Sequence, residues 1–471
     1  MTTRRLYQVW HKHLGAQLTT HLQISEKITG WDGDVTQPAL GLSEKHLQIL
    51  RTRVNYFVHS ASSISLGAPL KRMIPSVILA SLEAAHLALS CEKLIRFVYV
   101  STAYANAHVH DLFDGTDYGI IGEDIYPLMD GSLNFVSAAS ELSSILEGGM
   151  PSDPTILRHF PWAYAYAKHL TERCLMNVFA ITHKLFDQWV NMHGASSANP
   201  QEDLQKRLDL AELNSDTFPD QNSISTSNSR TAGSTPPTLL ILRPSCIGPA
   251  LRSPFPHYSI ARSTPLTGVG AAFITSLDLK PLVIASPHDD ALSETYSDEI
   301  PVDVVVNRLL LHLAAGTQGV VHAVCGRELA RQRATTSMVI AAANRERVLP
   351  WPIRMSFVHP HGTWNARGVG QVDKLFKVSG TRFDFGDVRT GEMLAGMLEE
   401  GGKDERVLKE WPMFAPAASI DLKSRRAYYR DIVAKVARKN GWPKWAMHVL
   451  CKSPRPSKTL VSRTEEENAT M

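Results

Sequence analysis

A tyrosine and a lysine four residues apart form the pair in this 471-residue sequence whose types and spacing most directly suggest chemistry. Tyr164 and Lys168 stand in residues 163–178, whose apolar spacing predicts a helix, and residues four apart share one face of a helix. A nearby cation favours the phenolate, so Lys168 is expected to lower the pKa of Tyr164 and to permit proton exchange with a substrate oxygen near neutral pH. The spacing alone also arises in ordinary helices that have no catalytic role.

Two hydroxyl side chains follow a predicted strand upstream of this helix. Residues 96–101 form a β-branched and aromatic run, and Ser101 and Thr102 stand at its end. Ligands of parallel sheets bind outside the carboxyl ends of the strands, so these hydroxyls are expected beside a reacting carbonyl. There, a hydroxyl can donate a hydrogen bond to an oxygen that gains negative charge. Capping of a helix is the alternative role for both side chains.

The elements that must position these residues alternate along the chain. Predicted strands at residues 55–59, 96–101, 238–243 and 319–324 are separated by helical apolar patterns at residues 70–89, 163–178 and 301–315. The first two strands are separated by about 40 residues, which is long enough for a parallel crossover. The sequence therefore predicts an α/β fold with a Rossmann-like, doubly wound parallel sheet.

Composition divides the chain into two predicted domains. Residues 1–345 form the Rossmann-like domain, with a polar surface insertion at about residues 212–237 that is too poor in apolar side chains to join a core. Residues 346–471 form a mostly helical C-terminal domain. A basic helix at residues 425–438, followed by Trp442 and Trp445, predicts either a solvated face or a peripheral membrane contact.

Charge and cysteine content exclude several classes of protein. A net charge of +3 is too small for an electrostatic grip on nucleic acid. The 5 cysteines lack ligand spacing, and His359 and His361 lack a third ligand, so neither a metal site nor a disulfide framework is expected. Apolar runs shorter than the ~20 residues of a membrane span predict no transmembrane segment. A reducing compartment follows, with the cytoplasm as the default location and with peroxisomal or membrane-peripheral placement left open.

Six segments of the chain occur together in the order and spacing of one family. They are residues 33–35 (Gly-Asp-Val), 59–62 (His-Ser-Ala-Ser), 100–104 (Val-Ser-Thr-Ala-Tyr), 164–168 (Tyr-x-x-x-Lys), 242–249 (Leu-Arg-Pro-Ser-Cys-Ile-Gly-Pro) and 299–307 (Glu-Ile-Pro-Val-Asp-Val-Val-Val-Asn). In these segments the chain resembles the fatty acyl-CoA reductases, or male-sterility-like proteins, of the extended short-chain dehydrogenase/reductase superfamily. A weaker similarity follows at residues 378–385.

The resemblance implies NADPH-dependent reduction of a fatty acyl-CoA to an aldehyde or an alcohol. In that interpretation Tyr164 protonates the carbonyl oxygen, and Lys168 lowers the pKa of Tyr164 and binds the nicotinamide ribose. Thr102, with Ser101 as the second choice, holds the oxygen.

Further residues are implied as cofactor contacts by the same resemblance. Asp34 would contact the adenine, and Ala61 would line the cofactor backbone. Arg243, Pro244 and Ser245 would flank the nicotinamide end. No metal ligand is implied.

Two departures from the family pattern favour an alternative. No Thr-Gly-x-x-Gly-x-x-Gly turn, which binds pyrophosphate at a helix N-terminus, precedes Asp34, so the resemblance predicts a sheet truncated at its N-terminal side. Val77 occupies a position where the family commonly has asparagine, and valine cannot make its hydrogen bonds. The alternative function is a non-catalytic relic that binds a lipid or a partner protein. A nucleotide-sugar epimerase or dehydratase is disfavoured by residues 243–249 and 301–307.

Overall fold

The computed structural model describes residues 3–24, 28–112, 119–130, 132, 134–193, 236–259, 264–266, 281–286, 288–326, 330, 332, 335–346, 351–358, 378–400 and 441. Several sequence predictions lie outside the described residues: most of the insertion at residues 212–237, the helix at residues 425–438 with Trp442 and Trp445, and the histidines His359 and His361.

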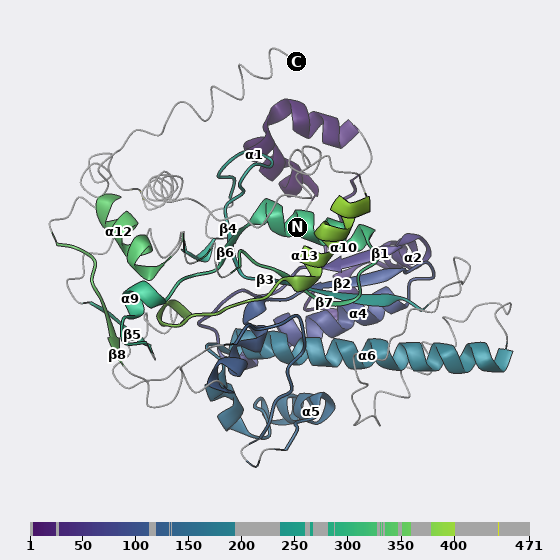
Figure 1. Cartoon of the computed structure of the whole chain (residues 1–471). Helices are drawn as coiled ribbons and strands as arrows, with labels where there is room; N and C mark the ends of the chain where they lie inside the picture. The colour runs from purple at the N-terminus through teal and green to yellow at the C-terminus, as the bar shows by residue number, and fades with distance from the viewer. Residues whose placement is uncertain are drawn as a thin grey trace.

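A parallel sheet of four strands forms the centre of the fold (Figure 1). The strands are β1 (Tyr56–His59), β2 (Arg96–Val100), β3 (Thr238–Pro244) and β7 (Gly319–Ala323), in the order β1-β2-β3-β7. Every neighbouring pair is parallel. Strands β2 and β3 are buried along almost their whole length, which explains their continuous apolar sequence. The predicted strands, the parallel crossover and the α/β fold class are thereby confirmed.

Helices cover both faces of this sheet. In Figure 1, α4 (Ala80–Leu89) and α6 (Ala163–His193) lie on one side, and α10 (Val302–Ala314) and α13 (Val388–Glu400) lie on the other. Side chains of β2 alternate between the two layers, because Phe97 packs with Leu175 of α6 whereas Val98 packs with Val304 of α10. The doubly wound arrangement follows from this alternation.

The helical segment before β2 contains an irregular turn. It consists of α3 (Leu70–Met73), a π-helical turn η2 (Ile74–Leu79) and α4. Pro75 stands at the start of η2 and has no N–H to donate to the preceding turn, which favours a local departure from α-helical bonding.

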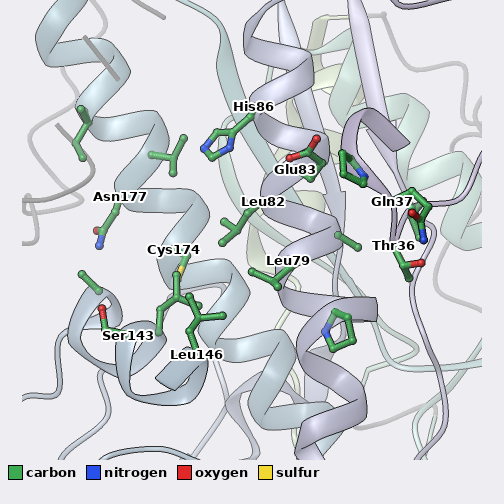
Figure 2. Close-up of a pocket in the computed structure, with 18 residues that line it drawn as sticks. Thr36, Gln37, Leu79, Leu82, Glu83, His86, Ser143, Leu146, Cys174 and Asn177 are labelled. Carbon is green, nitrogen blue, oxygen red and sulfur yellow. The ribbon is translucent and has the colours of Figure 1, made fainter. Parts of the chain in front are cut away.

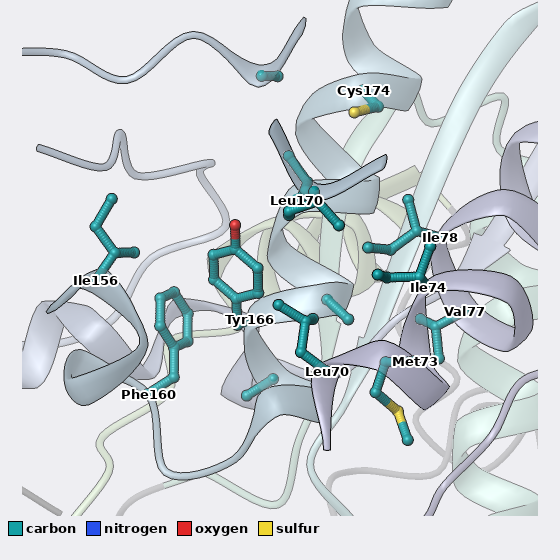
Figure 3. Close-up of a cluster of buried hydrophobic side chains, with 14 of the residues drawn as sticks. Leu70, Met73, Ile74, Val77, Ile78, Ile156, Phe160, Tyr166, Leu170 and Cys174 are labelled. Carbon is teal, nitrogen blue, oxygen red and sulfur yellow. The ribbon is translucent and has the colours of Figure 1, made fainter. Parts of the chain in front are cut away.

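This segment, Leu70–Leu89, is also long and apolar enough to cross a bilayer by length and composition, contrary to the sequence prediction. In the structure 56% of its apolar window is buried inside the protein. Its apolar side chains pack against α6 and η4 (Pro154–His159) in the cluster of Figure 3, which includes Met73, Val77, Phe160 and Leu170. It therefore acts as a core helix of the sheet-covering layer.

Shorter elements complete the described chain. They are α1 (Thr3–Ile24), η1 (Pro38–Gly41), α2 (Glu44–Arg53), η3 (Ala103–Leu112), α5 (Ala138–Gly148), α9 (Ala291–Glu294), α12 (Thr336–Glu346) and the parallel pairs of β4 (Cys246–Gly248) with β6 (Glu299–Pro301) and β5 (Leu282–Ala285) with β8 (Met355–Val358). Within residues 3–24 and 28–55, no strand precedes β1.

Residues after 345 are joined to the sheet by hydrogen bonds. The Glu123 carboxylate accepts one from the His322 backbone N–H of β7 at 2.7 Å and one from the Arg389 N–H at the start of α13 at 2.8 Å. Arg308 of α10 donates to Asp387 at 2.9 Å. The described part of the region beyond residue 345 thus contains β8 and α13, and the domain boundary near residue 345 stays a prediction.

Candidate active site

The first turns of α6 meet the carboxyl end of β2 at Lys168. Its ammonium donates a hydrogen bond to the Val100 carbonyl at 2.9 Å, and Ser101 is the next residue along the chain. Ser101 and Thr102 are buried, and the Ser101 hydroxyl is buried without a hydrogen-bond partner among the described residues. The structure therefore brings Lys168 and the predicted hydroxyl pair to the same end of the sheet.

Lys168 carries its charge in an almost fully buried position. Its side chain is only 2% exposed, and its nitrogen lies 4.5 Å from the centre of the Tyr99 ring and 5.9 Å from that of Tyr164. Burial lowers the pKa of Lys168 to about 7, and the negative charge of Glu172 opposes this shift. Lys168 can therefore gain or lose a proton near neutral pH.

The pKa of Tyr164 shifts in the direction opposite to the sequence prediction. Burial raises it above its ordinary value, and the Glu172 carboxylate raises it further. The predicted lowering by Lys168 is wrong in this structure, because burial and Glu172 both raise the pKa of Tyr164 and the ammonium hydrogen-bonds to the Val100 carbonyl. Tyr164 is accordingly held as a neutral phenol, the form that donates a proton.

Arg243 lies at the end of β3 with its side chain inside the protein. Its Nε and Nη2 donate to the two oxygens of Glu172 at 2.9 and 2.6 Å, and its Nη1 donates to the Asp124 carbonyl at 2.7 Å. Both side chains of the ion pair are fully buried. With the guanidinium engaged in this way, a cofactor contact of Arg243 would have to come from its backbone, and the assignment stays a prediction.

Pro244 and Ser245, the other two residues predicted to flank the cofactor, continue from Arg243. Pro244 is the buried last residue of β3. The Ser245 hydroxyl donates to the Asp298 carboxylate at 2.5 Å. This hydrogen bond fixes the strand end on which the predicted site is built.

Asp34 and Ala61 lie in exposed loops. The Asp34 carboxylate accepts hydrogen bonds from the backbone N–H and the hydroxyl of Thr36 at 2.9 and 2.7 Å, which lower the pKa of Asp34. The Asp34 N–H donates to the Leu40 carbonyl, which closes a tight loop. Their roles as cofactor contacts stay predictions.

The sequence did not single out Glu172 as a site residue. It follows Lys168 by four residues, so Tyr164, Lys168 and Glu172 form one row along a face of α6, and extending the spacing by one more step would have found it. His59 is a buried, hydrogen-bonded residue. Its Nε2 lies 3.1 Å from the Ser81 hydroxyl, and burial lowers the pKa of His59 to about 4.

The residues at the carboxyl end of β2 and in the first turns of α6 fit the nicotinamide end of a dinucleotide. Among the described residues the buried Ser101 hydroxyl has no hydrogen-bond partner, so a ligand could accept its hydrogen bond. Lys168 donates to the carbonyl of Val100, the residue before Ser101. A glycine-rich phosphate turn is not found before Asp34 in the sequence.

A cavity of about 540 Å³ lies elsewhere, on the outer side of the helical layer (Figure 2). It is bounded by η2, α4, α5 and α6 and is lined mainly by apolar side chains, with Leu79, Leu82, Leu146 and Cys174 near its middle. None of the predicted site residues lines it. Among the described residues, no group of three or more His, Cys, Asp or Glu side chains is arranged to hold a metal ion.

Part of the chain is similar to a known protein family. Residues 2–182 match the family model described as male sterility protein. The chain is 22% identical over 302 residues to human fatty acyl-CoA reductase 2, covering 64% of this chain and 43% of that protein. It is 29% identical over 191 residues to the alcohol-forming fatty acyl-CoA reductase of Simmondsia chinensis, covering 37% of this chain and 38% of that protein.

A solved structure is also similar. The reductase domain of a nonribosomal peptide synthetase from Mycobacterium tuberculosis aligns with 92% of this chain and 82% of its own, with 13% identity and a TM-score of 0.46. The chain spans 26% and 43% of the length of two similar proteins from Drosophila melanogaster and 43% of the length of the human protein. Residues 2–182, which contain Ser101, Thr102, Tyr164 and Lys168, are therefore similar to the male sterility protein family.

Proposed function

We propose that this protein is an NADPH-dependent reductase of fatty acyl-CoA thioesters. The observation that carries the proposal is the joining of Tyr164 and Lys168 on α6 to the end of β2 through the Lys168–Val100 hydrogen bond, beside the open Ser101 hydroxyl. The two relatives named above are fatty acyl-CoA reductases, and this similarity supports the substrate class. The choice of NADPH over NADH, and a cytoplasmic location, are parts of the proposal.

The bound cofactor would supply a hydride to the thioester carbonyl carbon, and the chain's own residues would manage the oxygen and the protons. Ser101 or Thr102 donates a hydrogen bond to the oxygen as it gains negative charge. Tyr164, kept as a phenol by its raised pKa, gives its proton to that oxygen. Lys168, whose pKa is about 7, returns a proton to Tyr164 and holds the ribose hydroxyls. Loss of the CoA thiol from the reduced carbon leaves the aldehyde.

Turnover of the Tyr164→Phe variant tests this assignment. NADPH oxidation by the purified chain is followed with palmitoyl-CoA, and the variant is expected to lose roughly 10²- to 10⁴-fold in rate because the proton donor is gone. Tyr166→Phe is the matched control, since Tyr166 lies on the same helix but donates to Glu141 away from the site. Equal turnover by wild type and Tyr164→Phe would overturn the assignment.

A non-catalytic, lipid-binding role is the second candidate. Val77, which takes the place of the family's asparagine, is fully buried in an apolar cluster and contributes no side-chain hydrogen bond. Isothermal titration calorimetry with NADPH separates the two candidates. Saturable binding supports the reductase, whereas no binding together with saturable binding of palmitoyl-CoA supports the relic.

A further inference from the structure

Two charged residues, Glu172 and Arg243, form a buried ion pair close to Lys168. Glu172 follows it by one helical turn on the same face of α6, and Arg243 comes from β3 on the facing sheet. At this spacing on a helix a lysine and a glutamate are close enough to form a salt bridge. Here both carboxylate oxygens of Glu172 accept hydrogen bonds from Arg243, at 2.9 and 2.6 Å, and the Lys168 ammonium bonds to the Val100 carbonyl instead.

We propose that Arg243 and Glu172 are positioning residues for Lys168: Arg243 holds the Glu172 carboxylate within electrostatic reach of the ammonium while preventing the direct salt bridge that would draw Lys168 away from Val100 and Tyr164. Both members of the pair are 0% exposed, so solvent does not screen their charges. The Asp124 carbonyl fixes the third guanidinium nitrogen and leaves Arg243 a single arrangement.

The charges around Lys168 support this arrangement. The titratable and charged groups that face the ammonium are Glu172 and Tyr164 on its own helix, Tyr99 on β2 and His59 on β1, with Arg243 behind Glu172. Glu172 acts on three of the buried groups at once, raising the pKa of Lys168, Tyr164 and Tyr99. The carboxylate thus favours both the ammonium form of Lys168 and the phenol form of Tyr164, the two proton-carrying forms that a reduction needs.

The inference rests on the proposed function for the importance of Lys168, but its test needs neither substrate nor cofactor. The readout is the pH midpoint of the Lys168 side-chain signal in NMR spectra of the ligand-free full chain, labelled with ¹³C and ¹⁵N lysine. The signal is identified by its absence from the Lys168→Met variant. A chain without reductase activity still gives this midpoint, so failure of the inference is distinct from failure of the proposed function.

The two single variants are expected to move the midpoint in opposite directions. Arg243→Met frees the Glu172 carboxylate to pair with Lys168 and raises the midpoint by about 1 pH unit or more, a tenfold gain in proton affinity. Glu172→Gln removes the negative charge, leaves the Arg243 cation nearby, and lowers the midpoint by a similar amount. A pair that served only to stabilise the fold would shift neither midpoint, and that result would overturn the proposal.

A second ion pair on the same helix provides the matched control. Arg173 donates to Glu141 at 2.6 Å, with exposures of 1% and 0%, and this pair acts on Tyr166 rather than on Lys168. Glu141→Gln is therefore expected to destabilise the fold as Glu172→Gln does while leaving the Lys168 midpoint unchanged. A shift of the same size in Glu141→Gln would contradict the proposal.

A double variant keeps the test decisive if a single variant does not fold. Glu172→Met with Arg243→Met replaces the pair by apolar side chains, an exchange that buried ion pairs often tolerate. Because Glu172 raises the pKa of Lys168, the double variant, which lacks this carboxylate, is expected to lower the midpoint. A raised or unchanged midpoint in the folded double variant would also overturn the proposal.

Discussion

The Lys168 ammonium and the Val100 backbone carbonyl lie 2.9 Å apart, and this contact links α6 to β2 one residue before Ser101. A lysine that is only 2% exposed disfavours the folded state, because its charge is removed from water. Keeping such a residue at the end of a sheet is typical of a functional site, where local stability is given up for chemistry.

The lowered pKa of Lys168 should make the free energy of unfolding depend on pH. The ordinary pKa of lysine is about 10.4 and that of Lys168 in the folded chain is about 7, so between these values the unfolded chain binds more protons. The free energy of unfolding contributed by Lys168 therefore rises with pH from about 7 to about 10, and is lost as the pH falls back through that window. Urea unfolding at pH 7, 8, 9 and 10 measures it.

Lys168→Met provides the reference for that measurement. Burial raises the pKa of Cys91 to about 11 and that of Cys174 to about 12, which acts in the opposite direction at alkaline pH. Both thiols are present in wild type and variant, so their contribution cancels in the difference. The stability of wild type minus that of Lys168→Met should rise with pH, and a flat difference would show that Lys168 keeps an ordinary pKa.

Replacing the Asp298 carboxylate, near the end of β3, should lower the free energy of unfolding. Its Oδ1 accepts from the Ser245 hydroxyl at 2.5 Å and from the Cys325 N–H at 2.8 Å, and its Oδ2 accepts from the Gly326 N–H at 2.9 Å. In Asp298→Asn the side-chain NH2 group replaces one acceptor oxygen and faces a donor, so one hydrogen bond is lost. This loss should lower the unfolding free energy by about 1–3 kcal/mol. Denaturant unfolding measures this loss.

Ser245→Ala is the milder comparison for Asp298→Asn. It removes one donor and leaves two backbone donors on the carboxylate, so a loss of about 0.5–1.5 kcal/mol is expected. A loss in Ser245→Ala as large as that in Asp298→Asn would mean that the backbone contacts contribute little.

Two glycines in the last described segment should respond to alanine in opposite ways. A Cβ on Gly380 would contact the Ala285 carbonyl and lie 2.8 Å from the Ile284 Cγ2, so Gly380→Ala should push residues 378–380 off β5 and cost about 1–3 kcal/mol. A Cβ on Gly396, within α13, meets no atom within 4 Å. Gly396→Ala should therefore stabilise the helix by about 0.5–1 kcal/mol. Thermal unfolding of both variants checks the opposite signs, and a stabilised Gly380→Ala would refute the close packing.

The elements of the sheet layer were predictable from local patterns. Residues 238–243 have the continuous apolar run of a buried strand, and residues 163–178 have the 3.6-residue periodicity of a helix. The shared face of Tyr164 and Lys168 follows from the same periodicity. Such a pattern predicts which side of a helix or strand faces the core.

The partners of buried charges were not predictable in this way. Glu172 and Arg243 stand 71 positions apart, and Glu123 reaches His322 and Arg389 across 199 and 266 positions. The spacing of charged residues in the sequence does not show which distant residue they will pair with. The raised pKa of Tyr164 escaped prediction for the same reason, since it depends on burial and on Glu172 rather than on Lys168 alone.

The outer edge of β1 has a consequence for the protein in concentrated solution. Among the described residues, β1 pairs with β2 alone, and Tyr56 and Val58 are 51% and 41% exposed along it. The backbone groups on that side form a template onto which another extended chain can add, and the aromatic and β-branched side chains favour such growth. Self-association should therefore begin at this strand, and colloidal stability during purification will depend on keeping that edge covered or the protein dilute.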